Sequence, residues 1–201
     1  MSRTSPEISG NWGIMGGVFD PIHYGHLALA EGALEAFGFE GVLFVVSFDP
    51  PHRDQKPVVS FDDRLEMVGI AVKDNDRFMV SALEKDLELP GYTLNIVTHL
   101  KKKSPGAVWH LILGADNLAC FDTWYKPDEL VKHVKIVVGD RPGYTRESEK
   151  SKWLGHADRF GIPRLDISST AIRESVRRNK SVRYLLPENV RRFIVEKGLY
   201  R

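Results

Sequence analysis

The chain has 201 residues, with 28 Lys and Arg against 27 Asp and Glu and a formal net charge of +1. This balance excludes a highly basic nucleic-acid coat and an acidic disordered chain, so we expect no nucleic-acid partner. Hydrophobic residues make up 42% of the chain, which is enough to bury a sizeable core. The length predicts a single domain over residues 1–201.

Cysteine content and hydropathy exclude two further classes of protein. Cys120 is the only cysteine, so an internal disulfide cannot form. No apolar run approaches the roughly 20 residues that a membrane helix needs, and we expect a cytoplasmic protein without a membrane partner. Residues 1–10 are polar and are predicted to be a flexible leader or an artificial extension. Nothing in the sequence predicts the oligomeric state.

Apolar runs typical of buried strands alternate with segments of helical periodicity, as a parallel sheet with crossover helices requires. In the first predicted helix, 24–37, the residues Leu27, Ala30 and Leu34 recur at three- and four-residue steps and share one face. Strands are predicted over 12–17, 42–47, 78–81, 107–113, 134–139 and 165–167, and a surface loop over 141–155. Further helices are predicted over 61–72, 93–103, 126–133, 169–178 and 187–197. This order predicts an α/β fold, a Rossmann-like doubly wound parallel sheet with a C-terminal helical part over 169–201.

The segment between the first strand and the first helix carries the most informative motif, Gly16-Gly17-Val18-Phe19-Asp20-Pro21-Ile22-His23-Tyr24-Gly25-His26. In a parallel sheet this position is the carboxyl end of a strand, where ligands bind. Two glycines let the backbone approach a phosphate, and the free amides of a helix start attract an anion. His23 and His26 are three residues apart, so both imidazoles can donate to the same group. The motif is suited to a phosphorus centre whose oxygens gain charge as it reacts.

Other interpretations of this motif are open. The two histidines could bind zinc, although no third ligand stands at a familiar spacing. They could also be satisfied core histidines beside a simple glycine turn. The motif matches neither Gly-x-Gly-x-x-Gly nor Gly-x-x-x-x-Gly-Lys-Ser/Thr, which disfavours a dinucleotide-binding dehydrogenase and a P-loop enzyme.

Two further motifs follow predicted strands. In Ile167-Ser168-Ser169-Thr170-Ala171-Ile172-Arg173 the hydroxyls could simply cap a helix. With free amides and the Arg173 guanidinium they could also hold the outer phosphates of a nucleoside triphosphate. In Gly114-Ala115-Asp116-Asn117-Leu118, the Asp116 carboxylate could accept hydrogen bonds from a ribose, help to hold Mg²⁺, or act as an ordinary helix N-cap.

In this order the motifs resemble the nucleotidyltransferase superfamily with the His-x-Gly-His signature, and more closely the bacterial nicotinate mononucleotide adenylyltransferases. The resemblance runs from Gly16 to Tyr200. It also includes Pro50-Pro51-His52-Arg53, Arg64-Leu65-Glu66-Met67, Tyr92-Thr93, Thr123-Trp124-Tyr125, Arg141-Pro142-Gly143, and Leu186-Pro187 through Gly198-Leu199-Tyr200. A single short motif is weak evidence, but several in the family order are strong.

The resemblance implies transfer of AMP from ATP to the phosphate of nicotinate mononucleotide in NAD biosynthesis, by direct in-line attack without a protein nucleophile. It implies that His23, His26 and Arg173 are catalytic and also bind ATP. Further ATP contacts are implied at Gly16, Gly17, Phe19, Gly114, Asp116, Ile167, Ser168 and Ser169. Contacts to the acceptor are implied at His52, Arg53, Tyr92, Thr93, Trp124, Tyr125 and Arg141. Mg²⁺ would bridge the ATP phosphates chiefly through water rather than through dedicated protein ligands.

The sequence departs from the family pattern near the implied pyridine pocket. Gly91 stands where Ser is common and Asn95-Ile96 where Asp-Thr is common, while Val18 replaces a Thr or Ser. The first two departures leave nicotinamide mononucleotide open as the acceptor. Another phosphorylated acceptor such as phosphopantetheine is a further alternative, although the extended segment after Arg173 argues against the shorter phosphopantetheine enzymes. As an isolated pair, Trp124 and Tyr125 would be core or rim aromatics. A nucleotide-binding regulator without catalysis and a metal hydrolase built on the histidines are the alternatives from other classes.

Charge is unevenly distributed along the chain. Residues 169–201 carry nine Lys and Arg against three Asp and Glu, whereas residues 1–168 carry nineteen against twenty-four. This predicts a local basic wall beside the triphosphate motif, suited to one small, highly charged ligand such as Mg-ATP.

Overall fold

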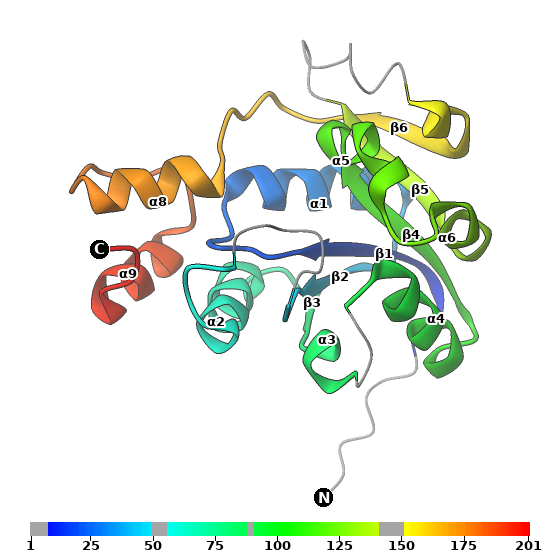
Figure 1. Ribbon diagram of the computed structural model, residues 1–201, viewed down its shortest axis with the longest axis horizontal. Coiled ribbons are helices and arrows are strands. Elements are labelled where there is room, and N and C mark those ends of the chain that lie inside the picture. The colour runs from blue at the N-terminus through cyan, green and yellow to red at the C-terminus, as the bar shows by residue number, and fades with distance from the viewer. Residues whose placement is uncertain (1–7, 50–55, 88–90, 141–150) are drawn as a thin grey trace, which may run out of the picture.

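The computed structural model describes residues 8–49, 56–87, 91–140 and 151–201. In these residues a parallel sheet has the strand order β3-β2-β1-β4-β5-β6 (Figure 1). The strands are β1 (Gly10–Gly17), β2 (Gly41–Val46), β3 (Phe78–Ser81), β4 (Ala107–Gly114), β5 (Lys135–Asp140) and β6 (Ala157–Gly161). The helices are α1 (Tyr24–Phe37), α2 (Phe61–Val72), α3 (Leu83–Asp86), α4 (Thr93–Lys103), α5 (Ala115–Ala119), α6 (Pro127–His133), α8 (Ser169–Arg177) and α9 (Glu188–Lys197), with 3-10 helices η1 (Phe121–Thr123) and η2 (Lys152–His156). The predicted Rossmann-like fold is confirmed.

The strand order reverses between β1 and β4, and their pairing explains where the sheet opens. These strands pair only as far as Ile14 and Leu111. Beyond that point β1 continues beside β2 up to Gly17, whereas β4 continues beside β5 up to Gly114. The carboxyl ends of β1 and β4 therefore diverge at the topological switch point, which is where open α/β sheets bind their ligands.

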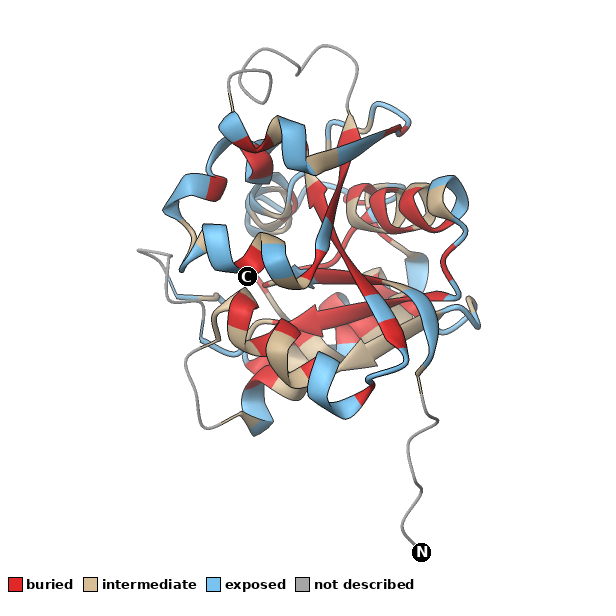
Figure 2. Cartoon of the chain, turned by 90° about the vertical axis from the view of Figure 1, so that its right-hand side faces the viewer, coloured by how far each residue is buried: buried red, intermediate tan, exposed pale blue. Residues whose placement is uncertain are grey.

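Hydrophobic side chains cover the two faces of the sheet as separate core clusters. One cluster includes Leu29 on α1, Met67 on α2 and Ile194 on α9. The other includes Leu100 on α4 and Leu130 on α6. Figure 2 shows the buried strands between helices whose outer surfaces are exposed. Burial on both faces explains why β2 is apolar without alternation, since all its residues are buried.

The C-terminal helices belong to the same core as α1 and α2. Ile172 on α8 and Val190 on α9 are both buried in that cluster. Figure 1 shows α8 and α9 beyond one end of the sheet, beside α1 and α2. The predicted C-terminal helical part is therefore packed against the element that carries the histidine motif. Within the described residues, no helix is long and apolar enough to cross a membrane.

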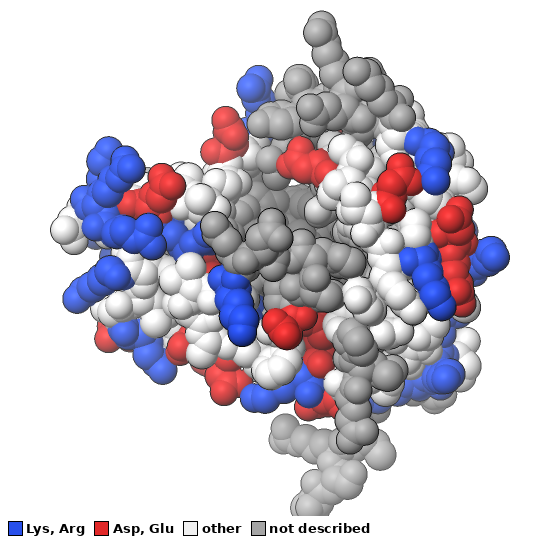
Figure 3. Space-filling view, in the orientation of Figure 1, with Lys and Arg blue, Asp and Glu red and all other residues white. Residues whose placement is uncertain are grey.

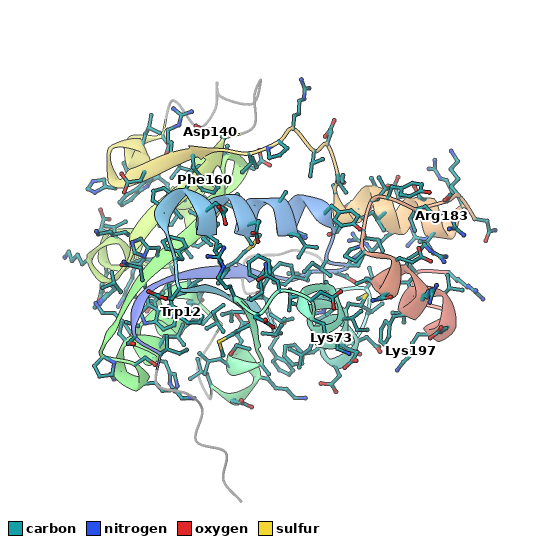
Figure 4. All side chains as sticks on the ribbon, turned by 180° about the vertical axis from the view of Figure 1, so that it is seen from behind. Trp12, Lys73, Asp140, Phe160, Arg183 and Lys197 are labelled. Atoms are coloured by element: carbon teal, nitrogen blue, oxygen red, sulfur yellow. The ribbon has the colours of Figure 1, made fainter. Side chains whose placement is uncertain are left out.

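The prediction of a strand over 165–167 is wrong. This segment has no regular structure, and the last strand of the sheet is β6. Ile167 is partly buried and packs against the core around α1, which explains the apolar pattern that indicated a strand. In β6 itself only Phe160 is buried, and Figure 4 shows this residue beside α1. An edge strand with one buried side chain has no apolar run to reveal it.

The predicted surface loop over 141–155 is wrong at its end. Residues 141–150 lie outside the described residues, but the following segment forms η2. Trp153 anchors it, being 3% exposed, with its ring 5.3 Å from that of Phe121. Its indole Nε1 donates to Asp122 over 2.7 Å. A polar stretch is held here by one buried aromatic side chain.

Several boundaries and short elements also differ from the predictions. The first strand begins at Gly10, whose N–H donates to Gly106 O over 3.1 Å, while residues 1–7 of the predicted leader lie outside the described residues. Helix α9 begins one residue later than predicted, because Pro187 is its N-cap. The helices α3 and α5 have four and five residues, too few to show a helical period.

Candidate active site

The last two residues of β1 are glycines, and they lie beyond the point where β1 stops pairing with β4. Gly16 is exposed, and a Cβ there would meet no described atom within 4 Å. Gly17 is different, since a Cβ there would lie 2.9 Å from Phe19 Cζ. Phe19 itself has a φ of 50°, in the left-handed region, and its buried ring packs against Phe44 at 5.9 Å. Gly16 thus leaves space for a ligand, whereas Gly17 leaves space for the ring that shapes the turn.

The two motif histidines lie against each other at the start of α1. Their rings are stacked, with centroids 3.7 Å apart and planes at 20°. His23 is the N-cap of α1, and its N–H donates to His26 Nδ1 over 3.3 Å. A neutral imidazole that accepts at Nδ1 carries its proton on Nε2, so this hydrogen bond sets the tautomer of His26. The stacking places both rings on one side of the helix start.

Asp20 connects this turn to three distant segments. It is 5% exposed, and its Oδ1 accepts from Tyr200 Oη while its Oδ2 accepts from Val58 N–H, each over 2.7 Å. Its backbone oxygen accepts from Arg173 Nη1, also over 2.7 Å. Burial, and then the bond to Asp20, raise the pKa of the Tyr200 phenol above its ordinary value. The phenol therefore remains a donor to Asp20 at neutral pH.

Arg64 on α2 connects the ends of β1 and β2 by hydrogen bonds. The side chain is 1% exposed, and its Nη1 donates to Val18 O over 2.8 Å and to Ser47 O over 2.6 Å. Burial lowers the pKa of Arg64, while the charge of Asp20 acts in the opposite direction. A buried guanidinium that donates to carbonyls fixes the relative position of two strand ends.

The structure brings the start of α8 against the histidine motif. Ser169 Oγ donates to Pro21 O over 2.8 Å, and a Cβ on Gly25 would lie 3.7 Å from Ile167 O. Ser168 is the N-cap of α8, and its Oγ accepts from Ala171 N–H over 3.2 Å. The capping role of Ser168 is confirmed. Two motifs that are about 145 residues apart in the sequence thus meet at one edge of the sheet.

The Arg173 guanidinium bridges these two motifs. Besides its bond to Asp20 O, its Nη2 donates to Thr170 Oγ1 over 3.3 Å. The guanidinium has five N–H donors, so these two bonds leave donors that can face an anion. Arg173 is partly buried, which strengthens its interaction with a phosphate compared with a fully solvated arginine.

The third motif follows β4 on the other side of the switch point. Gly114 is the N-cap of α5, and Asp116 is an exposed residue within the first turn of that helix. The N-cap interpretation of Asp116 is therefore wrong. A Cβ on Gly114 would meet no described atom within 4 Å, so the backbone there is open to a ligand. The ribose and Mg²⁺ roles of Asp116 stay predictions.

The aromatic residues predicted for the acceptor come from two loops that meet. The rings of Tyr92 and Tyr125 are stacked, with centroids 4.2 Å apart and planes at 16°. Thr93 is the first residue of α4, directly after Tyr92 at the N-cap. Trp124 is partly buried against Phe121, with ring centroids 5.1 Å apart. The remaining predicted acceptor residues, His52, Arg53 and Arg141, lie outside the described residues.

Sequence reasoning assigned no role to the buried polar residues that hold this site together, Asp20, Arg64, Glu84 and Tyr200. Glu84 on α3 is 4% exposed, and its carboxylate accepts from Phe48 N–H. Burial raises the pKa of Glu84 to about 7. The burial of Arg64 could have been predicted, because this charged residue falls among the apolar positions that α2 buries. The other contacts join distant segments, and no local pattern indicates them.

The prediction of one basic wall around the triphosphate is wrong. Arg191 pairs with Glu188 at 2.6 Å, and Lys197 pairs with Asp63 at 3.4 Å. Lys and Arg gather at the end of the molecule formed by α8 and α9 (Figure 3), and Figure 4 shows Arg183 and Lys197 at the outer ends of these helices. Arg173 is the cation of 169–201 whose described hydrogen bonds reach the histidine motif.

The described residues contain no group of three or more His, Cys, Asp and Glu side chains placed to hold a metal ion. This geometry does not supply a third protein ligand beside His23 and His26 within the described ranges. It leaves room for a metal that arrives with the phosphates of a nucleotide and keeps water in most of its coordination sphere.

Comparison with known proteins defines the class to which this fold and site belong. Residues 14–175 match the family model described as cytidylyltransferase-like. These residues include the histidine motif and the start of α8 that lies against it. The fold is also that of solved structures: a Plasmodium falciparum nicotinic acid mononucleotide adenylyltransferase complexed with NaAD superposes with a TM-score of 0.81 at 20% identity, covering 95% of this chain and 97% of the other.

Curated relatives narrow the class further. A probable nicotinate-nucleotide adenylyltransferase of Rubrobacter xylanophilus is 41% identical over 195 residues, covering 94% of this chain and 91% of that protein. One of Desulfitobacterium hafniense is 40% identical over 196 residues, covering 94% and 95%. The chain therefore belongs to the cytidylyltransferase-like family and, within it, to the nicotinate-nucleotide adenylyltransferases.

Proposed function

We propose that this protein transfers AMP from ATP to nicotinate mononucleotide, giving nicotinate adenine dinucleotide and pyrophosphate in NAD biosynthesis. The relatives that share about 40% of its residues over almost their full length have the corresponding name. The observation that carries the proposal is the pair of stacked imidazoles at the switch point, with Arg173 hydrogen-bonded to the same turn. This arrangement is suited to binding the phosphates of ATP at the start of α1.

The reaction needs no protein nucleophile. An oxygen of the acceptor phosphate attacks the α-phosphorus of ATP, and the bond from that phosphorus to the α,β-bridging oxygen breaks. Pyrophosphate leaves with the electron pair of the broken bond, and the AMP group is now joined to the acceptor. Catalysis then consists of placing two phosphates in line and stabilising the charge that develops on the phosphoryl oxygens.

We assign this task to three side chains. His26 would donate from Nε2 to the ATP phosphates, because its Nδ1 accepts from His23 N–H. His23, stacked against it, would donate to the same phosphates and stabilise the transition state. Arg173 would bind the β- and γ-phosphates, together with Ser168, Ser169 and the amides at the start of α8. Gly16 would let the backbone approach the phosphates.

Mg²⁺ is the metal that we propose for this reaction. When bound, it neutralises charge on the triphosphate and on the leaving pyrophosphate. It would be held by phosphate oxygens and water, since the described residues offer no cluster of ligating side chains. Asp116, exposed at the carboxyl end of β4, would contact the ribose or a metal-bound water.

The acceptor would lie on the β4 side of the switch point, against the two loops that meet at the stacked rings of Tyr92 and Tyr125. An aromatic face and backbone amides near Thr93 suit a flat pyridine ring with a carboxylate. Trp124 would frame the ring from the adjacent loop. Its partial burial against Phe121 fixes its orientation.

The test compares acceptors at fixed Mg-ATP by measuring pyrophosphate release with nicotinate mononucleotide, nicotinamide mononucleotide and phosphopantetheine. We expect the nicotinate compound to have the highest kcat/KM, by about tenfold or more, which corresponds to about 1.4 kcal/mol in transition-state binding. A preference of that size for another acceptor would overturn the substrate assignment. ATP binding without turnover of any acceptor would indicate a regulator instead, and activity that follows bound zinc would indicate a hydrolase.

The role of His26 has its own test. His26→Ala is expected to lower kcat by about 10² to 10³, the usual cost of removing a donor to a developing negative charge. His156→Ala is the matched control, because His156 is exposed on η2. Equal turnover of the two variants would remove His26 from the mechanism.

A further inference from the structure

Glu84 is a buried carboxylate that the reaction described above does not use. It lies in α3, directly after β3, and only 4% of its surface is exposed. Burial of an ionised carboxylate is costly unless hydrogen bonds compensate for the lost water. The contacts of this side chain therefore indicate what it is there to hold.

The Glu84 carboxylate contacts two segments of the chain. On one side, Oε2 accepts from the backbone N–H of Phe48, two residues after the carboxyl end of β2. On the other side lies Gly91, where a Cβ would be 2.7 Å from Glu84 Oε1. The next residue, Tyr92, is the N-cap of α4 and stacks on Tyr125. One carboxylate thus lies between the loop after β2 and the loop that bears the predicted acceptor residues.

Gly91 leaves the space that this contact needs. A Cβ there would lie against Glu84 Cδ and 2.8 Å from Glu84 Cγ, so a side chain at this position would displace the acid. The absence of a side chain at Gly91 therefore allows the acid to lie against the backbone beside Tyr92.

The groups around Glu84 have opposing effects on the pKa of its carboxyl group. Burial, the largest effect, raises its pKa, and the charge of Asp49 acts in the same direction. The backbone N–H groups of Phe48 and Asp49 and the charge of Arg64 lower it. The resulting pKa is about 7, so the ionisation of Glu84 changes within the physiological range.

We propose that Glu84 is a positioning residue for the acceptor: the hydrogen bond from the Phe48 amide keeps its ionised carboxylate against Gly91, and the carboxylate so fixes the loop that presents Tyr92 and Thr93. The proposal rests on the proposed function for the identity of the acceptor. Protonation of Glu84 weakens the bond to the Phe48 amide, because a neutral carboxyl group is a poorer acceptor than a carboxylate. Binding of the acceptor therefore improves as the pH rises, while binding of ATP at the start of α1 does not change.

The experiment measures kcat and KM for each substrate between about pH 6 and pH 8.5, for the unmodified protein, Glu84→Gln and Glu66→Gln. Glutamine resembles protonated glutamate in shape and charge, and Glu66 is an exposed acid on α2 that serves as the matched control. The ratio of the unmodified protein to Glu84→Gln is taken at each pH, because the ionisation of the substrates then cancels. This ratio isolates the effect of Glu84.

The expected ratio of kcat/KM for nicotinate mononucleotide rises by about tenfold across this range, mainly through KM, since a charged hydrogen bond is about twice as strong as a neutral one. The ratio for ATP is expected to stay constant, as are both ratios for Glu66→Gln. A constant acceptor ratio, or an equal rise in the ratio for ATP, would overturn the proposal.

A second variant covers the case in which Glu84→Gln does not fold. Glu84→Asp keeps the charge but withdraws the carboxylate by one methylene, so the acceptor KM is expected to rise at every pH while kcat changes little. An unchanged acceptor KM in Glu84→Asp would overturn the positioning role. If another acceptor is turned over in place of nicotinate mononucleotide, the proposed function fails, but the same ratio measured with that acceptor still decides the role of Glu84.

Discussion

The hydrogen bond between Tyr200 and Asp20 gives a direct test of how the end of the chain supports the site. Tyr200→Phe removes one oxygen atom from a side chain that is 4% exposed and leaves the ring in place. The lost bond is 2.7 Å long and ends on a buried carboxylate. Asp20 keeps its bond from Val58 N–H but loses the donor to Oδ1.

The expected cost follows from this geometry. A hydrogen bond to a charged group contributes about 1.5 to 3 kcal/mol, so the variant should lose about 2 kcal/mol of unfolding free energy. For a chain of this size that corresponds to a fall in Tm of about 4 to 8 °C. The pKa of Tyr200 is raised in the folded protein, so its contribution is fully present below the ordinary value of 10.0 and is lost at higher pH. The difference between the two proteins should therefore be constant up to about pH 9.

Urea unfolding at neutral pH measures this free energy, and Tyr184→Phe is the matched control because Tyr184 is 87% exposed and also has a positive φ. The control should differ from the unmodified protein by less than about 0.5 kcal/mol. If Tyr200→Phe is as stable as the control, the bond to Asp20 contributes nothing and the reasoning is refuted.

Three further changes test other parts of the site. Glu84→Gln should gain stability relative to the unmodified protein as the pH rises from about 4.5 to about 7, by about 3 kcal/mol in total, because the pKa of Glu84 is raised from its ordinary value of 4.5 to about 7 in the folded protein. Parallel stability curves in urea across that range would contradict this. Gly17→Ala should lose about 1 to 3 kcal/mol and turnover, because its Cβ would lie 2.9 Å from the Phe19 ring, whereas Gly16→Ala should keep its unfolding free energy. Arg64→Met should lower the free energy of unfolding in urea by about 3 kcal/mol, because the carbonyls of Val18 and Ser47 lose their buried donor. The control is Arg77→Met, since Arg77 is exposed, and a smaller loss in Arg64→Met than in this control would exclude a structural role for Arg64.

Local patterns in the sequence predict most of this fold. Continuous apolar runs indicate β2 and β4, and the spacing of Leu27, Ala30 and Leu34 indicates α1, because burial of a face imposes a period on the sequence. Elements whose burial rests on a single side chain show no such period. Phe160 alone anchors β6 and Trp153 alone anchors η2, so neither element shows a period.

The same distinction holds for the candidate site, which is predicted from the sequence only in part. The glycines at the end of β1 and the histidines after it indicate a phosphate site from the sequence, since the residue types and the strand-to-helix position suffice for that inference. Which other segments join them does not follow from local chemistry. Asp20 meets Tyr200 across 180 positions, and Arg173 meets Asp20 across 153.

By itself, the sequence determined an alternating α/β chain with a phosphate motif at the end of its first strand, because strand and helix periods and turn glycines act over a few residues. The tertiary structure decided which polar groups are buried and what they hold. Glu84, unremarkable in the sequence, has a pKa of about 7 because packing removes its water, and this effect outweighs the opposing effect of the hydrogen bond from the Phe48 amide. Desolvation depends on every neighbour that surrounds a group, and those neighbours come from distant parts of the chain.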